Sequence, residues 1–409
     1  MSISTSSQRS STNEPQPTTP ADWVARAEAV ATQLAIDAVE RDRANATPYA
    51  EVQLLKDSGL VTLLGPVEHG GGGQSWTTAN RVIRAISAGD GSIGQLIGYH
   101  YLWSWAVRLV GTPEQVAAVE QQAVQNQWFF GGAVNPRDSD LVITEVDGEL
   151  AYNGRKSFST GGRVSDVTVL EGVIEGTDDH VFAIVPTQQD GIRFLGDWDN
   201  LGQRLTESGG VEIVDVRVPW EAAAGYVDRV FQPRVYNTLN VPLIQLIFAN
   251  IYVGIGQGAL STAATYTRDR TRAWPYAGDV KQNAAAEFHV QETYGDLQSK
   301  LWAAEALTEQ AATLIETINA HADSVTAEER GEAAVVIAAA KQVANDAALE
   351  ITNRIFEVTG ARATANSVGL DLFWRNIRTH SLHDPVAHKR AEVGRFALLG
   401  EIPEPTWYT

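Results

Sequence analysis

The first quarter of the chain carries apolar residues at helical spacing, with turn signals between the segments. Asp90-Gly91-Ser92 is a helix start before the apolar segment 93–110, and Thr112-Pro113 starts another helix. One apolar stripe contains Ala27, Val30, Ala31, Leu34 and Ala38. The pattern predicts an N-terminal α-helical domain over residues 21–126.

After Gln127 the spacing changes to the alternation of β-strands. The run 142–146 alternates and leads into Asp147-Gly148, which is typical of a hairpin, and Asn153-Gly154 predicts a second turn. We therefore expect a small, mostly antiparallel middle β domain over residues 127–234.

The helical period returns in four long segments, which predict a C-terminal four-helix bundle over residues 235–399. The expected spans are 241–271, 283–320, 327–358 and 371–399. The sequence GIGQG at 254–258 resembles part of a dinucleotide loop. It lies inside a helical pattern without a preceding strand, so close helix packing is the better interpretation.

Both ends of the chain and its composition limit the class of protein. Residues 1–20 predict a disordered tail. Residues 400–409 form a second tail, whose Trp407 and Tyr408 are expected to pack against the rest of the protein or a neighbouring subunit. No apolar run is expected to reach the length that crosses a membrane, and the absence of cysteine suits a reducing cytoplasm. A net charge of −19 disfavours nucleic acid and anionic membranes as partners.

The segment WRNIRTHSLHDPVAHKR at 374–390 is the richest in candidate chemistry. His380 and His383 are three residues apart, and Asp384-Pro385 predicts a break between two helices, with Asp384 as the cap of the second. A histidine at such a break fits an active site and a capped turn equally well. The neighbouring arginines weigh against a metal site at these residues.

Three other groups suggest weaker hypotheses. Arginines 268, 270 and 272 fit either a phosphate clamp or a helix C-terminus, with the second favoured. The hydroxyl-rich segment GRKSFSTGG at 154–162 suits close approach to a flat ligand but is also a common turn. His100, among aromatic residues, and Trp198 are core residues by default and pocket walls as the alternative.

Three motifs carry a family resemblance: QLIFAN at 245–250, FEVTGAR at 356–362 and WRNIRTHSLHDPV at 374–386. They resemble the acyl-CoA dehydrogenase superfamily, in its flavin-dependent monooxygenase branch, and within this branch the enzymes that oxidise dibenzothiophene. The resemblance implies a mostly α fold with a middle β domain, a C-terminal four-helix bundle and a homotetramer. It also implies FMN, reduced by a separate flavin reductase that acts by flavin diffusion.

The resemblance also assigns roles to single residues. The dehydrogenases carry a glutamate base where this chain has His383-Asp384-Pro385. For the monooxygenase branch, the resemblance implies that His383 is the proton donor beside the flavin and that the Thr160 hydroxyl assists it. Arg272 matches an arginine that contacts the flavin phosphate, and Arg362 one that reaches a neighbour's flavin. Further flavin contacts are expected from Phe130, Gly132, Ser159, Thr160, Trp198, His383 and Asp384, and a substrate pocket from Tyr99, His100, Trp103 and Trp198, with His100 also counted as catalytic.

The implied activity is oxidation of an aromatic sulfur heterocycle to sulfoxide and sulfone. N-hydroxylation and aromatic hydroxylation stay open within the branch. An FAD-dependent acyl-CoA dehydrogenase and a flavin-fold DNA-binding protein are the rival hypotheses, the second disfavoured by the acidic charge. Gly132 stands where the relative has an active-site asparagine, a departure expected to remove a hydrogen bond and open volume.

Overall fold

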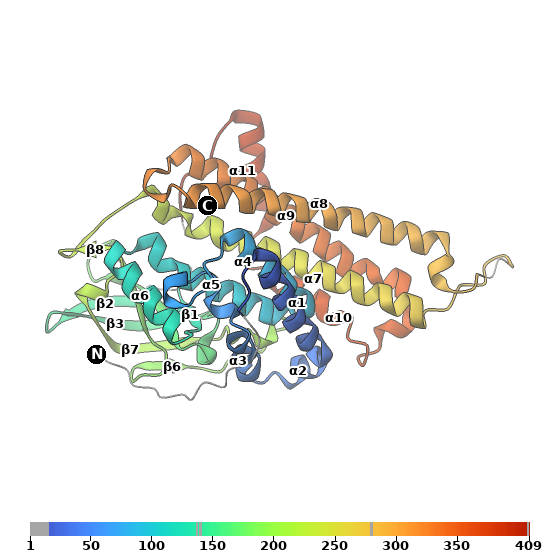
Figure 1. The fold of residues 1–409 in the computed structure, drawn as a ribbon, viewed down its shortest axis with the longest axis horizontal. Helices are drawn as coiled ribbons and strands as arrows, with labels where there is room; N and C mark the ends of the chain where they lie inside the picture. Colours follow the sequence, from blue (N-terminus) through green and yellow to red (C-terminus); the bar gives the residue numbers. More distant parts are fainter. Residues whose placement is uncertain (1–15, 136–137, 139–140, 279–280, 407–408) are drawn as a thin grey trace.

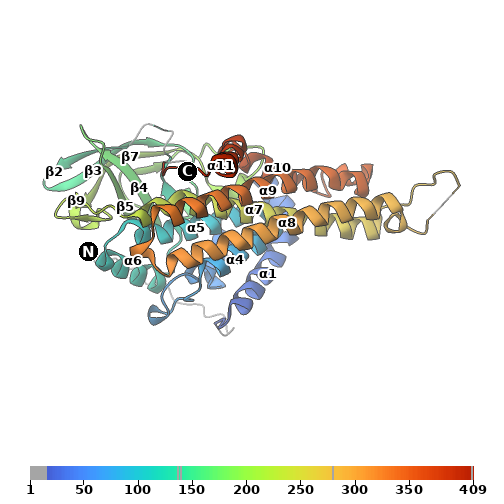
Figure 2. The same ribbon diagram turned by 90° about the horizontal axis from the view of Figure 1, so that it is seen from above.

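The computed structural model describes residues 16–135, 138, 141–278, 281–406 and 409. Helices, then strands, then helices follow one another along this part of the chain, as the colours of Figure 1 show. The sheet lies at one end of the molecule, and the long C-terminal helices run away from it (Figure 1, Figure 2). The predicted class, mostly helical with a middle β region and a C-terminal helical bundle, is confirmed.

The N-terminal helices start where the capping residues predict. Asp90 accepts hydrogen bonds from the backbone N–H groups of Ser92 and Ile93, and Thr112 forms a capping box with Gln115. The helices are α1 Pro20–Ile36, α2 Ala38–Ala44, α3 Tyr49–Asp57, α4 Trp76–Gly89, α5 Gly91–Val110 and α6 Pro113–Gln125.

The main sheet has the strand order β1-β4-β2-β3-β7-β6, and β5, outside this order, also pairs with β4. Strands β1 and β2 run parallel to β4, and the remaining pairs are antiparallel. The strands are β1 Phe130–Ala133, β2 Leu141–Val146, β3 Glu149–Lys156, β4 Val167–Ile174, β5 His180–Pro186, β6 Ile192–Phe194 and β7 Val211–Pro219. A separate hairpin joins β8 Tyr226–Val227 to β9 Val230–Phe231.

One predicted turn is confirmed and one is wrong. Asp147-Gly148 joins β2 to β3 in a hairpin. Asn153-Gly154 lies inside β3, where the pairing with β7 shifts at a bulge between Tyr152 and Gly154. Gly154 has a φ of 144°. A bulge needs the same backbone freedom as a turn, which explains why the two sequence signals look alike.

The C-terminal helices are α7 Asn240–Arg270, α8 Phe288–Asn319, α9 Ala327–Thr359, α10 Asp371–His380 and α11 Val386–Leu399. The expected span 371–399 is thus two helices. Helix α7 packs on α4, α5, α8 and α9. A Cβ on Gly254 would lie 2.3 Å from the Arg84 carbonyl oxygen, and one on Gly258 2.2 Å from that of Ala88. The glycines therefore permit the close approach of α7 to α4, as interpreted from the sequence.

The segment Val235–Arg270, which contains α7, is long and apolar enough to cross a membrane, so the expectation that no run reaches that length was wrong by length and composition. However, 89% of its most apolar window is buried inside the protein. A helix surrounded by other helices must be apolar on every side, and α7 is such a core helix.

Candidate active site

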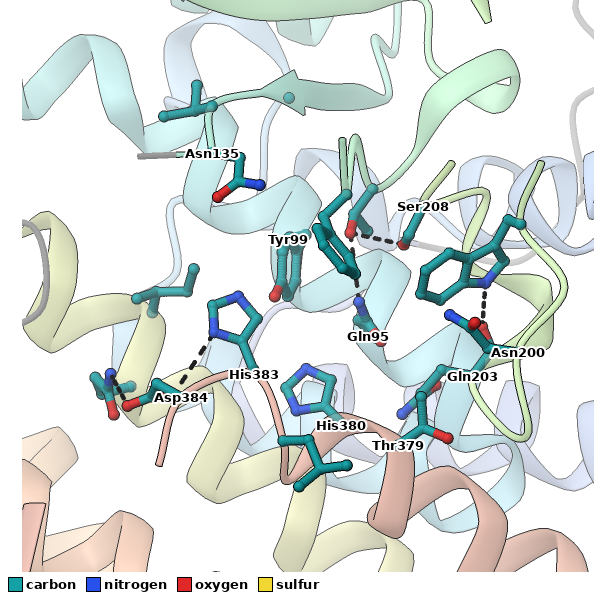
Figure 3. A pocket seen from close by; sticks show the side chains of 18 of the residues that line it. Gln95, Tyr99, Asn135, Asn200, Gln203, Ser208, Thr379, His380, His383 and Asp384 are labelled. Atoms are coloured by element: carbon teal, nitrogen blue, oxygen red, sulfur yellow. Dashed lines mark hydrogen bonds and ion pairs between the residues drawn. The ribbon is translucent and has the colours of Figure 1, made fainter. Parts of the chain in front are cut away.

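A cavity of about 680 Å³ lies where α5, α7 and the end of α10 meet the loops of the sheet. Figure 3 shows Asn200, Gln203 and Ser208 on one side of the cavity and His383 and Asp384 on the other. The remaining lining includes Gln95, Tyr99, Trp103, Gly132, Asn135, Phe158, Thr160, Trp198, Ile244, Gln245, Arg378 and His380. Most of the expected site residues therefore meet in one place.

His383 lies in the break between α10 and α11, as predicted, and its side chain is 45% exposed. Its ring centroid is 6.0 Å from that of His380 and 4.6 Å from that of Phe248. Its Nδ1 is 3.7 Å from an Asp384 oxygen, and Figure 3 shows the other ring nitrogen on the opposite edge. The imidazole thus has one nitrogen beside a carboxylate and one available to a ligand.

The predicted capping role of Asp384 is wrong. The N-cap of α11 is Pro385, without a side-chain cap, and Asp384 instead forms an ion pair with Lys341 of α9. Its second oxygen accepts a hydrogen bond of 3.2 Å from the Gln245 amide. Burial alone would raise the pKa of Asp384, but His383 and Lys341 outweigh it and hold the pKa well below its usual range. A cation buried on a distant helix outcompetes the local backbone N–H groups.

Buried Lys341 has a side chain that is only 1% exposed. Burial lowers its pKa to about 8, although the Asp384 carboxylate opposes this shift. Its Nζ also lies 5.4 Å from the centroid of the Phe248 ring, and the same ring contacts His383. Lys341, Asp384 and His383 therefore form a continuous polar chain from the bundle to the cavity.

Thr160 lies on the cavity wall and is held by hydrogen bonds. Its Oγ1 is 2.8 Å from the Ser208 hydroxyl and accepts a bond of 3.4 Å from the Gln95 amide. Trp198 donates from Nε1 to the Gln203 carbonyl at 2.8 Å. Ser159 is buried next to this wall, outside the lining, and its hydroxyl has no hydrogen-bond partner among the described residues.

His100 and Phe130 do not line the cavity. The Nδ1 of His100 accepts a 3.1 Å bond from the Phe130 N–H, so Nε2 carries the proton and donates to the Val61 carbonyl at 2.7 Å. Its ring stacks on Phe129 at 4.9 Å, and burial lowers its pKa to about 4. Both nitrogens have partners within the protein, which favours the core interpretation of His100 over the expected substrate and catalytic role. One residue before it, Tyr99 faces the cavity.

The expectation that Gly132 opens volume is also wrong. A Cβ at this position would lie 2.4 Å from Cε2 and 2.5 Å from Nε1 of Trp103. The indole of Trp103 therefore fills the space beside Gly132, and both residues line the cavity.

Neither expected arginine lines the cavity, and both are exposed. Arg272 follows the end of α7, which Figure 1 places at the tip of the long helices away from the sheet. Arg362 lies in the short helix Ala361–Thr364. Trp407 and Tyr408 lie outside the described residues.

Sequence reasoning missed several residues of the site. Gln95 lies one turn before Tyr99 on α5, a spacing that could have indicated a shared face. Lys341 is a lone cation in the alanine-rich stretch of α9, which is a signal for a buried partner. Phe158 has a φ of 56° on the cavity rim, a conformation rare for aromatic residues that no sequence pattern indicates.

Comparisons with known proteins agree with this fold. The family models of the acyl-CoA dehydrogenase N-terminal and C-terminal domains match residues 24–125 and 246–387. Dibenzothiophene monooxygenase of Rhodococcus erythropolis is 39% identical over 94% of this chain and 95% of its own. The probable FMNH2-dependent monooxygenase SfnC of Pseudomonas putida is 37% identical, over 97% of this chain and all of its own.

Among solved structures, FMN-bound TdsC from Paenibacillus sp. A11-2 superimposes with a TM-score of 0.89 at 36% identity, covering 95% of this chain and 100% of that one. The chain therefore belongs to the acyl-CoA dehydrogenase family, in its branch of flavin-dependent monooxygenases. It is an oxidoreductase. The dehydrogenase hypothesis fits poorly, because a carboxylate at position 384 that is paired with Lys341 is a weak proton acceptor.

Proposed function

We propose that this protein is a two-component monooxygenase that uses reduced FMN and oxygen to oxidise the sulfur of an aromatic heterocycle to sulfoxide and sulfone. The observation that carries the proposal is His383 beside a mostly apolar cavity, at the place where a dehydrogenase has its glutamate. Similarity to proteins that are named for dibenzothiophene and for FMNH2 supports the substrate class and the cofactor.

The polar groups around the cavity fit a flavin. Buried atoms of Gln95, Ser159 and Gln203 have no hydrogen-bond partner among the described residues, and such atoms are normally paired. Gln95 and Gln203 line the cavity near Thr160 and Trp198, where the polar edge of a flavin ring would satisfy them, and Ser159, outside the lining, precedes Thr160 in the chain. Reduced FMN, when bound there, supplies the electrons for oxygen activation, so that one oxygen atom reaches the sulfur and the other leaves as water.

The chain's own residues have three tasks in this proposal. His383 holds a proton at the nitrogen that faces away from Asp384 and delivers it on the cavity side. Thr160 orients a hydrogen bond toward the same space. Tyr99, Trp103 and Ile244 exclude water and present an apolar surface to the substrate.

We further propose a homotetramer in the cytoplasm, supplied by a separate flavin reductase. Arg272 and Arg362 are exposed and away from the cavity of their own chain. A phosphate-binding role for them therefore requires the cavity of a neighbouring subunit. A small aromatic substrate remains the expected partner, and nucleic acid and membrane the disfavoured ones.

The test mixes the purified protein with chemically reduced FMN, oxygen and dibenzothiophene, and measures sulfoxide and sulfone. Indole and a short-chain acyl-CoA are the comparison substrates. Sulfoxide formation that depends on both reduced FMN and oxygen supports the proposal. Oxidation of indole alone would favour a carbon hydroxylase, and oxidation of the acyl-CoA without oxygen incorporation would favour the dehydrogenase.

A further inference from the structure

The pairing of Trp103 with Gly132 at the cavity wall has a steric basis. Strand residue Gly132 pairs with Val169 of β4, and its φ is not in the left-handed region. Any residue could adopt this backbone conformation. Glycine is required here by space alone, because a Cβ would meet three indole atoms at 2.4 to 2.8 Å.

Among the described residues, the indole of Trp103 is held by packing and not by a hydrogen bond. Trp103 is 5% exposed on α5, one turn after Tyr99, so both rings face the cavity. Its Nε1 has no hydrogen-bond partner among the described residues. Replacing the ring therefore removes no bond within the described part of the protein, and a change at position 132 is transmitted directly to the ring.

We propose that Trp103 and Gly132 act together as the specificity-determining wall of the cavity, selecting flat ring substrates by their width. This proposal rests on the proposed function and deepens it, because it names the pair of residues that sets the substrate class. The wall contains Tyr99, Trp103, Gly132 and Val134, which are apolar or aromatic and line the cavity.

The effects of substitutions at Gly132 and Trp103 on the width of the cavity should depend on each other. In Gly132→Ala the new methyl must displace the indole, because Cβ contacts below 3.0 Å essentially do not occur. A displaced indole narrows the cavity. Trp103→Leu removes all three contacted ring atoms, so it widens the cavity and should also tolerate the methyl of Gly132→Ala.

The experiment measures binding of indole, carbazole, benzothiophene and dibenzothiophene to the flavin-free protein by calorimetry. In Gly132→Ala the three-ring compounds should lose affinity at least about tenfold relative to the two-ring compounds, the scale of discrimination in apolar pockets. Trp103→Leu should shift the preference toward three rings. In the double variant, Gly132→Ala should have little further effect.

Trp105→Leu is the matched control, because Trp105 lies on the same helix, is 8% exposed and does not line the cavity. It should leave the ring preference unchanged even if it lowers stability. The binding experiment is independent of turnover, and indole and carbazole contain no sulfur. A wild-type protein that fails to oxidise sulfur would therefore contradict the proposed function without contradicting the role of the wall. Unchanged ring preference in both Gly132→Ala and Trp103→Leu would overturn the wall, as would the absence of ring binding in the wild type.

Discussion

Lys341 and Asp384 form a buried ion pair that joins the C-terminal bundle to the turn bearing His383. Removing Lys341 takes away the cation that balances the largely buried Asp384 carboxylate, which keeps only the Gln245 amide and His383 beside it. Lys341→Met should therefore lower the free energy of unfolding by about 3–5 kcal/mol. The double variant Lys341→Met/Asp384→Asn should recover most of this loss, because no lone charge remains. Denaturant titration of the wild type and of both variants measures the difference; equal stability of the single and double variants would contradict it.

The same pair predicts a pH dependence of stability. The pKa of Asp384 is lower in the folded protein than its ordinary value of 3.8. Its contribution to stability is therefore fully present above about pH 4 and is lost as the pH falls from there toward the folded pKa. Wild-type stability should consequently fall more steeply with acid below about pH 4 than that of Lys341→Met/Asp384→Asn. If the stabilities of the wild type and the double variant fell in parallel with decreasing pH, Asp384 would not be the group whose protonation lowers stability.

His383→Phe should keep the fold and FMN binding but uncouple oxygen consumption from product formation. The side chain is partly exposed, so stability changes little, whereas loss of one catalytic proton donor costs about 10²–10⁴-fold in rate. The ratio of hydrogen peroxide to oxygenated product is the measurement. His388→Phe is the control, since His388 is exposed on α11 and does not line the cavity. Equal coupling in both variants would return His383 to a structural role.

His100→Phe should affect stability much more than turnover. The ring can still stack on Phe129, but the Phe130 N–H and the Val61 carbonyl lose their partner, at a cost of about 1–3 kcal/mol. The folded pKa of about 4 lies below the ordinary 6.5, so the contribution of His100 is present above pH 6.5 and is lost as the pH falls toward 4. Unfolding curves between pH 4 and 7 should show this slope in the wild type and less of it in the variant. A large fall in kcat at unchanged stability would instead restore His100 to the site.

Arg272→Ala should weaken FMN binding by about 1.5–3 kcal/mol, the range for hydrogen bonds to charged groups. If Arg272 serves a neighbour's cavity, chains of Arg272→Ala and His383→Phe should complement each other after dissociation and reassembly. Random mixing would then create roughly a quarter of sites with both residues intact, given one arginine from each neighbour in a symmetric oligomer. Recovery of no activity, with hybrid oligomers present by mass spectrometry, would show that each chain uses its own Arg272 or none.

Local sequence patterns were sufficient for the elements and for part of the site. Asp90 and Thr112 mark helix starts because a side chain that caps backbone N–H groups acts within three residues. His383 lies at the predicted break because proline restricts its immediate neighbour. The resemblance of three motifs then gave the fold class and directed attention to His383 and Thr160.

The tertiary structure decided what each side chain contacts. Asp384 looks like a cap in sequence, but Lys341, 43 positions away, reaches it across the bundle. His100 and Tyr99 are adjacent in sequence, yet one is fully bonded in the core and the other faces the cavity, since neighbouring residues on a helix point about 100° apart. Gly132 and Trp103 meet only because α5 packs against β1. The sequence by itself determined the elements, because their signals are local; the partners of buried charges and rings depend on long-range packing, which only the folded chain defines.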